Sequence, residues 1–159
     1  MHWKVRREFL SRVEVFSNLG ARDLKAVAKS CSESAYDDGD FLCRQGERGV
    51  AAFLIVSGQI LVSSELGDGQ IVTLATLGQG SMVGELSIID GAQRVASVAA
   101  KGSVSALVLT MWDMQGLLKS RPSIAAAMLP VIVKRFRETT TELRNCNSDS
   151  QNTRHSVFQ

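Results

Sequence analysis

The chain reads Gly84-Glu85-Leu86-Ser87-Ile88-Ile89-Asp90-Gly91-Ala92-Gln93-Arg94-Val95-Ala96-Ser97-Val98 between two predicted strands. This segment joins a glycine, a carboxylate, one helical turn of apolar residues and a single arginine. Glycine lets the backbone come close to an anion, and a helix that begins there points unbonded N–H groups at it. Arg94 adds a planar set of donors for phosphate oxygens, whereas Glu85 suits a sugar hydroxyl. The segment therefore predicts a site for a small phosphorylated ligand.

A region of short strands surrounds this segment, from about residue 35 to residue 110. Glycines recur between short apolar runs, and the best predicted strands are 53–56, 59–63, 71–77, 96–99 and 105–109. Gly67-Asp68-Gly69 suits a hairpin turn between two of these strands. Many short strands with glycine turns predict a sandwich or a jelly-roll barrel.

Helices are predicted on both sides of the strand region. Residues 5–33 carry two apolar stripes, formed by Phe9, Leu10, Val13, Val15 and Phe16 and then by Leu24, Val27 and Ala28. After the strands, Thr110 and Asp113 resemble a capping box at the start of a helix. Pro122 suits the first turn of a second helix, which is expected to run to about Arg144 and to kink at Pro130.

The predicted organisation has four parts. They are N-terminal helices over 1–34, a barrel over 35–110, a hinge and C-terminal helices over 111–145, and a polar, disordered tail over 146–159.

The last predicted helix carries an apolar seam with 3-4-3-4 spacing. Its members are Leu129, Ile132, Phe136, Thr139 and Leu143. The seam either packs on the barrel of its own chain or pairs with its copy in a second chain. Heptad spacing favours a homodimer. The basic residues of this helix suit a solvated face, so no nucleic acid is expected as a partner of this chain alone.

Composition limits the remaining possibilities. A chain of 159 residues with a net charge of +2 and 45% hydrophobic residues is typical of one soluble domain. Cys31, Cys43 and Cys146 are odd in number and lack metal-site spacing, which predicts reduced thiols in a cytoplasmic protein. No window reaches the ~18 apolar residues that a membrane span needs, and the N-terminus lacks the apolar core of a signal peptide.

Catalysis is not expected. The two histidines, His2 and His155, lie near the chain ends, so neither a histidine metal cluster nor a Ser/His/Asp triad fits in the barrel. Glu85 has no nucleophile or acid partner. For Glu85 and Arg94, the alternative to ligand binding is a structural ion pair between strands.

The segment around Arg94 resembles the phosphate-binding cassette of the cyclic-nucleotide-binding domain superfamily, which includes catabolite activators and regulatory subunits of protein kinases. The family pattern is roughly F-G-E-L-A/S-L-L, four residues, and R-x-A-S/T-V, and residues 83–98 follow it with valine at position 83. Residues 39–47 and 55–58 resemble two further strand and turn motifs of the family. The resemblance covers about residues 8–145. It implies an α+β fold, an antiparallel β jelly-roll barrel (a double-stranded β-helix) flanked by N-terminal helices and a long C-terminal helix.

The resemblance also implies roles for individual residues. Gly84, Glu85, Leu86 and Ser87 would begin the cassette, with backbone N–H groups near the cyclic phosphate. Glu85 would hold the ribose 2′-hydroxyl, and Arg94 would pair with an exocyclic phosphate oxygen. The other expected ligand-binding residues are Val95, Ala96 and Ser97 in the cassette, Val62 and Leu74 on the pocket wall, and Arg135, Thr139 and Thr140 on the last helix.

Two departures from the family shape the functional prediction. Val95 offers no hydroxyl where the family often has one, which favours cAMP over cGMP as the ligand. The activators carry a helix-turn-helix after the last helix, where this chain has a short polar tail. The expected function is a cAMP-binding regulatory domain without a cofactor, whose C-terminal helices signal to an unidentified effector protein. The alternatives are the sensor half of a Crp/Fnr-type transcription regulator and an interaction module with a vestigial pocket.

Overall fold

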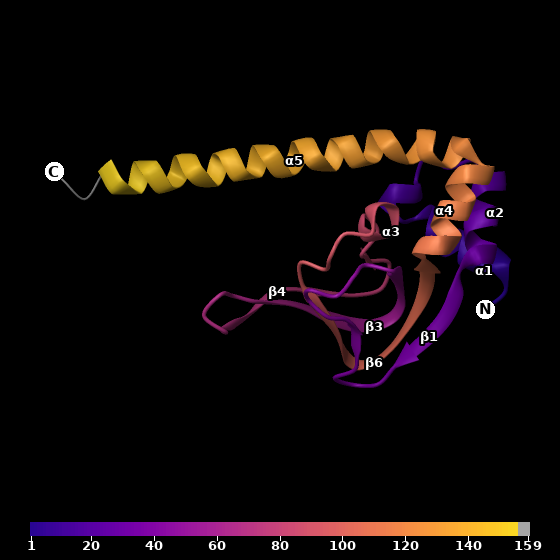
Figure 1. The fold of residues 1–159 in the computed structure, drawn as a ribbon, viewed down its shortest axis with the longest axis horizontal. Coiled ribbons are helices and arrows are strands. Elements are labelled where there is room, and N and C mark those ends of the chain that lie inside the picture. The colour runs from indigo at the N-terminus through magenta and orange to yellow at the C-terminus, as the bar shows by residue number, and fades with distance from the viewer. Residues whose placement is uncertain (156–159) are drawn as a thin grey trace.

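The computed structural model describes the backbone of residues 1–155 and the side chains of residues 1–138, 140 and 141. Six antiparallel strands form one strongly bent sheet, with helices at one end and a long helix along one side (Figure 1). The strands are β1 (Ser32–Tyr36), β2 (Phe41–Cys43), β3 (Ala51–Glu65), β4 (Ile71–Leu77), β5 (Met82–Val83) and β6 (Ser97–Thr110). This architecture confirms the predicted α+β fold, with an antiparallel sheet and flanking helices.

Two long strands organise the sheet. The path runs β1-β6-β3-β4, while β2 also pairs with β6 and β5 pairs with β3. The predicted strands 53–56 and 59–63 are one strand, β3, whose register against β6 shifts around Ser57. Gly58 has a φ of +87°, and a Cβ there would strike the backbone of Ser103. This glycine therefore marks a bend within a strand, not the turn that separates two strands.

Side chains on the two faces of the β3–β6 ladder belong to two different hydrophobic clusters. Leu54 and Leu107 face one another in the register and belong to the cluster beneath the helices. Ile55 and Ala106, the next pair, belong to the cluster inside the sheet. Alternation with period two thus explains why both faces of these strands are apolar.

The N-terminal helical region is broken into three pieces. They are α1 (Trp3–Ser11), the 3₁₀ helix η1 (Glu14–Phe16) and α2 (Ala21–Ser30). The predicted apolar stripes form their packed faces, since Leu10, Phe16 and Val27 are fully buried in the cluster beneath the helices. Gly20, in extended backbone, precedes α2.

The C-terminal region begins with the predicted capping box. In α4 (Met111–Ser120), the Asp113 N–H donates to Thr110 Oγ1 at 3.1 Å, and that hydroxyl donates to the Asp113 carboxylate at 2.6 Å. Helix α5 (Pro122–His155) then starts at Pro122, as predicted. The sequence predicted an end near Arg144 and disorder beyond it, whereas α5 continues to His155. The segment after Arg144 contains neither glycine nor proline, and extending an existing helix is far easier than starting one.

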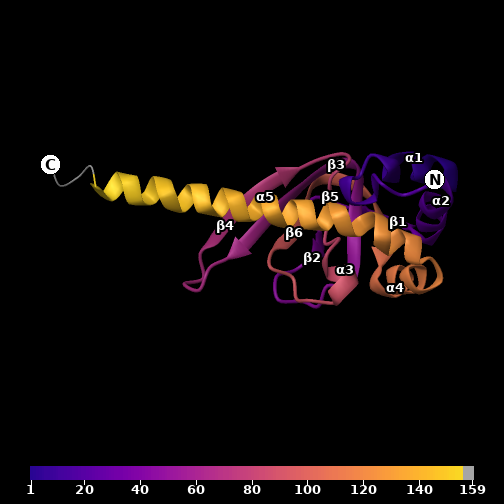
Figure 2. The same ribbon diagram turned by 90° about the horizontal axis from the view of Figure 1, so that it is seen from above.

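Helix α5 packs on the domain through its first turns and then extends past the sheet (Figure 2). Ile124, Met128 and Val131 are buried against the domain. The residues of the predicted seam do not share one environment. Ile132 packs against the chain's own core, whereas Leu129 and Phe136 are exposed, Phe136 by 72%. The side chains of Thr139 and Leu143 lie outside the described residues.

No single helix in the described part of the chain is both long and apolar enough to cross a bilayer. By length and composition alone, α4 and Pro122–Glu138 would together be sufficient, but the two are bent by 113°.

Candidate ligand-binding site

The cassette is a short turn that is fixed to the core at both ends. Strand β5 leads into Gly84, whose φ is +79°, and the four-residue helix α3 (Ser87–Asp90) follows. Ile88, in α3, is fully buried and anchors the turn in the cluster beneath the helices. Gly91 ends α3 in the left-handed conformation, and its N–H donates to the Ser87 carbonyl at 2.8 Å.

Arg94 is a buried cation without a carboxylate partner. Its side chain is 8% exposed, and it takes part in no ion pair among the described residues. One guanidinium nitrogen, Nη2, donates to the Ala51 carbonyl, while Nε has no hydrogen-bond partner within the described part of the chain. A buried charge without a counter-ion is costly. The arrangement is therefore one that an anion would complete.

The alternative of a structural ion pair between Glu85 and Arg94 is not what the structure shows. The Glu85 carboxylate, 16% exposed, pairs with Arg135 on α5 instead. The structure brings Arg135 and Glu85 together across 50 positions of the sequence.

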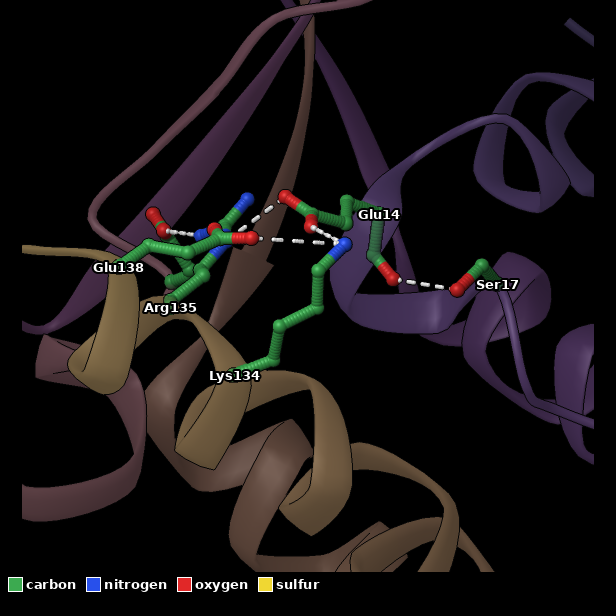
Figure 3. A network of polar contacts seen from close by, with 6 residues as sticks. Glu14, Ser17, Lys134, Arg135 and Glu138 are labelled. Carbon is green, nitrogen blue, oxygen red and sulfur yellow. Dashed lines mark hydrogen bonds and ion pairs between the residues drawn. The ribbon is translucent and has the colours of Figure 1, made fainter.

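Arg135 also binds a second carboxylate. Its Nε donates to Glu14 of η1 at 2.9 Å, and Lys134 lies 3.8 Å from Glu14 and 3.7 Å from Glu138 (Figure 3). Burial works to lower the pKa of Arg135, but the hydrogen bond with Glu14 and the charges of both carboxylates together raise it. One guanidinium thus links α5 to the cassette and to the N-terminal helices.

The cassette forms one wall of a cavity of about 380 Å³, a size within the range of small-molecule sites. Of the residues predicted from the sequence, eight line it: Val62, Gly84, Glu85, Leu86, Ser87, Arg94, Val95 and Ala96. Val95 is 86% exposed, which puts it at the mouth of the cavity. The cavity therefore has one guanidinium, the two carboxylates of Glu85 and Asp90, and an otherwise largely apolar wall.

Four predicted residues whose side chains the structure describes do not line this cavity: Leu74, Ser97, Arg135 and Thr140. Leu74 lies outside it and is 58% exposed. The pairing of β3 with β4 passes from Ala75 to Thr73, so Leu74 is the extra residue of a β-bulge and loses the alternation on which its assignment depended. Ser97 accepts a hydrogen bond from the Gln45 N–H at 2.9 Å. Thr140 donates to the Phe136 carbonyl at 2.9 Å, and the side chain of Thr139 lies outside the described residues.

Other residues of the cavity were missed by the sequence analysis. Cys43, Met82, Asp90 and Gln93 also line it. Gly49 supports it from behind, because a Cβ there would overlap the Ser87 side chain and lie 2.8 Å from the Ala92 carbonyl oxygen. A lone glycine in a loop gives no local signal of such a close approach. Burial raises the pKa of the Cys43 thiol, so it stays neutral at the cavity wall.

Comparison with known proteins agrees with this geometry. The family model described as "Cyclic nucleotide-binding domain" matches residues 33–121. A "CRP-like cAMP-activated global transcriptional regulator" of Mycobacterium tuberculosis is 27% identical over 136 residues, which cover 86% of this chain and 61% of that protein. The "Cyclic AMP receptor protein" of Thermus thermophilus is 32% identical over 130 residues, covering 81% and 60%.

A solved structure gives the same result. The N-terminal domain of a transcriptional regulator from Streptomyces coelicolor is 30% identical, with a TM-score of 0.75, and the match covers 82% of this chain and 94% of that one. The chain spans about 60% of the length of the two curated relatives. The matched region contains the cassette, Arg94 and Glu85, and the chain belongs to the cyclic nucleotide-binding domain family.

Proposed function

We propose that this chain is a regulatory domain that binds cAMP in the cavity beside Arg94. The observation that carries the proposal is the state of Arg94, a buried guanidinium whose Nε is unbonded within the described residues and which has no carboxylate partner there. A cyclic phosphate supplies the missing negative charge. The backbone N–H groups at the start of α3 add further donors, because the N–H groups in the first turn of a helix have no hydrogen-bond acceptor within the helix.

The opposite side of the cavity suits the sugar of the ligand. Glu85 uses its carboxylate to bind Arg135, but a carboxylate accepts several hydrogen bonds and retains capacity for a ribose hydroxyl. Val95, at the cavity mouth, offers no hydroxyl to a guanine base, and this supports cAMP over cGMP. The free Cys31 and Cys43 fit a cytoplasmic setting, in which thiols stay reduced.

Signalling follows from the contact between Glu85 and Arg135. A ligand that binds Glu85 competes for, or reorients, the carboxylate that holds α5 to the cassette. The position of α5 relative to the cassette and η1 then differs between the free and bound domains. The free energy by which the ligand shifts the equilibrium between these two positions equals the difference between its binding free energies for them. An effector protein that contacts α5 would read this difference.

Calorimetry on two arginine variants tests the site. Arg94→Leu removes the charge-assisted bonds to the phosphate, each worth about 1.5–3 kcal/mol. We expect cAMP affinity to fall at least about 100-fold while the far-UV circular dichroism stays unchanged. Arg44→Leu is the matched control, because Arg44 lies over the Phe41 ring and does not line the cavity. Equal cAMP affinity in the two variants would overturn the assignment.

A second candidate function is the sensor part of a longer transcription regulator. It is favoured by the two relatives, whose names describe a transcriptional regulator and a cyclic AMP receptor and of which this chain spans about 60%. Roughly 60 further codons with helix-turn-helix character in the same gene would decide for it. A melting-temperature screen with millimolar cAMP, cGMP and cyclic dinucleotides separates both candidates from an interaction module with a vestigial pocket, which no ligand would stabilise.

The proposed domain pairs with a second copy through α5. Leu129, Val133 and Phe136 are exposed and follow 4-3 spacing along one side of the helix. Phe136→Glu should convert a dimer to a monomer in sedimentation velocity. The exposed Arg137→Glu on the same helix is the charge control. A wild-type chain that sediments as a monomer at 100 μM would exclude the pairing.

A further inference from the structure

The first thirty residues hold an excess of positive charge. They contain seven Lys and Arg and three Asp and Glu, in a chain whose net charge is only +2. All three carboxylates are already paired: Glu8 with Arg12 at 2.8 Å, Glu14 with Arg135 at 2.9 Å and Asp23 with Arg121 at 3.2 Å. Five exposed cations remain without a carboxylate within 4.0 Å in the described part of the chain. These residues, Lys4, Arg7, Arg22, Lys25 and Lys29, are called the basic face.

Four of the five cations of the basic face lie around one aromatic ring, and this connects its residues on α1 with those on α2. Lys25 lies 4.7 Å from the centroid of the Trp3 ring, and Lys29 lies 6.0 Å from it, both on α2. Lys4 and Arg7 of α1 lie at 6.0 and 5.9 Å. Helices α1 and α2 pack against one another at the end of the domain (Figure 1). Several like charges are thus gathered, and the carboxylates of the first thirty residues are paired with other cations.

The surface between these helices is hollow, and part of its lining is apolar. A cavity of about 600 Å³ is lined by the apolar residues Val5, Ala21 and Leu24 and by the polar residues Lys4, Arg7, Glu8 and Ser11. Val5 is exposed. A neighbouring hollow of about 350 Å³ is lined by the three cations of α2, together with Ala26 and Arg121. Neither hollow includes a residue of the cyclic-nucleotide cavity.

We propose that the basic face docks an acidic amphipathic helix of a partner protein. Glutamate and aspartate side chains of that helix pair with the five cations, and an apolar side chain enters the hollow over Val5 and Leu24. The apolar part of the lining suits a peptide better than a phosphate backbone, which has no apolar group to place against Val5 and Leu24. A flat lipid surface would leave the hollow unfilled, and the Trp3 ring lies among cations. The proposal does not depend on cyclic-nucleotide binding.

Fluorescence anisotropy of a labelled probe peptide tests the proposal on the full chain. The probe is a 16-residue helix with glutamates on one face and leucines on the other, measured at 20 mM and 150 mM salt. Arg7→Glu combined with Lys25→Glu should weaken binding at least tenfold. Lys101→Glu, an exposed reversal in β6, should change it less than twofold. A probe with alanine in place of leucine should bind at least threefold more weakly, and added salt should weaken both.

A site-specific signal accompanies the affinity measurement. The chain contains two tryptophans, so Trp112→Phe leaves Trp3 as the sole reporter of the basic face. The emission of Trp3 should shift when the probe binds. Arg7→Gln with Lys25→Gln provides a milder variant if the reversals lower the melting temperature. Equal probe binding by the reversal and control variants would overturn the proposal. So would a Trp3 shift with vesicles of 70% phosphatidylcholine and 30% phosphatidylserine, or with a 16-nucleotide DNA, but not with the peptide.

Discussion

Replacing Gly84 by alanine should damage the ligand site more than the fold. Gly84 has a φ of +79°, a conformation that costs other L-residues about 1–2 kcal/mol. The new Cβ would overlap Nη1 of Arg94, lie 3.0 Å from its Cζ and lie 3.1 Å from the Ala51 carbonyl oxygen. The guanidinium must therefore move, and the Ala51 carbonyl oxygen leaves it little room to do so.

Gly102 provides a control with the same strain and no clash. Its φ is +74°, and a Cβ there meets nothing within 4 Å. The backbone strain alone should cost both alanine variants about 1–2 kcal/mol of unfolding free energy, which lowers the melting temperature by about 2–8 °C in a chain of this size, and the clash at Gly84 adds to this cost. Only Gly84→Ala should also lose cAMP affinity. Displacing one charge-assisted bond of Arg94 weakens binding about 10- to 100-fold.

Scanning calorimetry and isothermal titration calorimetry separate the two effects. The expected result is a fall in melting temperature in both variants, larger in Gly84→Ala because of its clash, and a fall in affinity in Gly84→Ala alone. Wild-type affinity in Gly84→Ala would refute the placement of the phosphate against Arg94. A parallel loss of affinity in both variants would show instead that general destabilisation governs binding.

Four further predictions concern other residues of the domain. Arg135→Gln cuts the links of α5 to Glu85 and Glu14 and should cost about 1 kcal/mol in urea unfolding; an equal cost in Arg137→Gln would contradict the role of the network. Thr110→Ala removes the cap of α4 and should also cost about 1 kcal/mol, whereas an unchanged urea midpoint would argue against the cap. Because burial raises the pKa of Cys43, its alkylation by iodoacetamide should be slow at pH 8, accelerate as the pH rises and be blocked by cAMP. Cys31, whose pKa burial raises to about 12, should stay unreactive at pH 10 while the chain is folded, and rapid labelling there would refute its burial.

The cassette could be predicted from the sequence because its residues are contiguous. Gly84, Glu85 and Arg94 carry their chemistry in their residue types and spacing, and the structure brings all three to one cavity. The Thr110 cap was equally local, since a hydroxyl three residues before a carboxylate is enough to recognise it.

Contacts between distant residues left no such signal. Glu14 and Arg135 are 121 positions apart, and neither has neighbours that point to the other. The prediction that Leu74 lines the pocket assumed strict alternation of side chains along β4. One extra residue in the pairing of β4 with β3 reverses the side of the sheet to which the side chains point. The polar composition after Arg144 predicted disorder, but α5 extends to His155. An established helix can continue through residues that could not start one.

Both hydrophobic clusters contain residues of β3 and β6, and this links the unfolding of one cluster to that of the other. A slip of one residue between these strands would exchange Leu54 with Ile55 and carry side chains of each cluster into the other. Neither cluster can therefore loosen while the other keeps its packing. The inner amides of the two strands should exchange with deuterium at one common, slow rate, set by a single event that opens both sides of the molecule together.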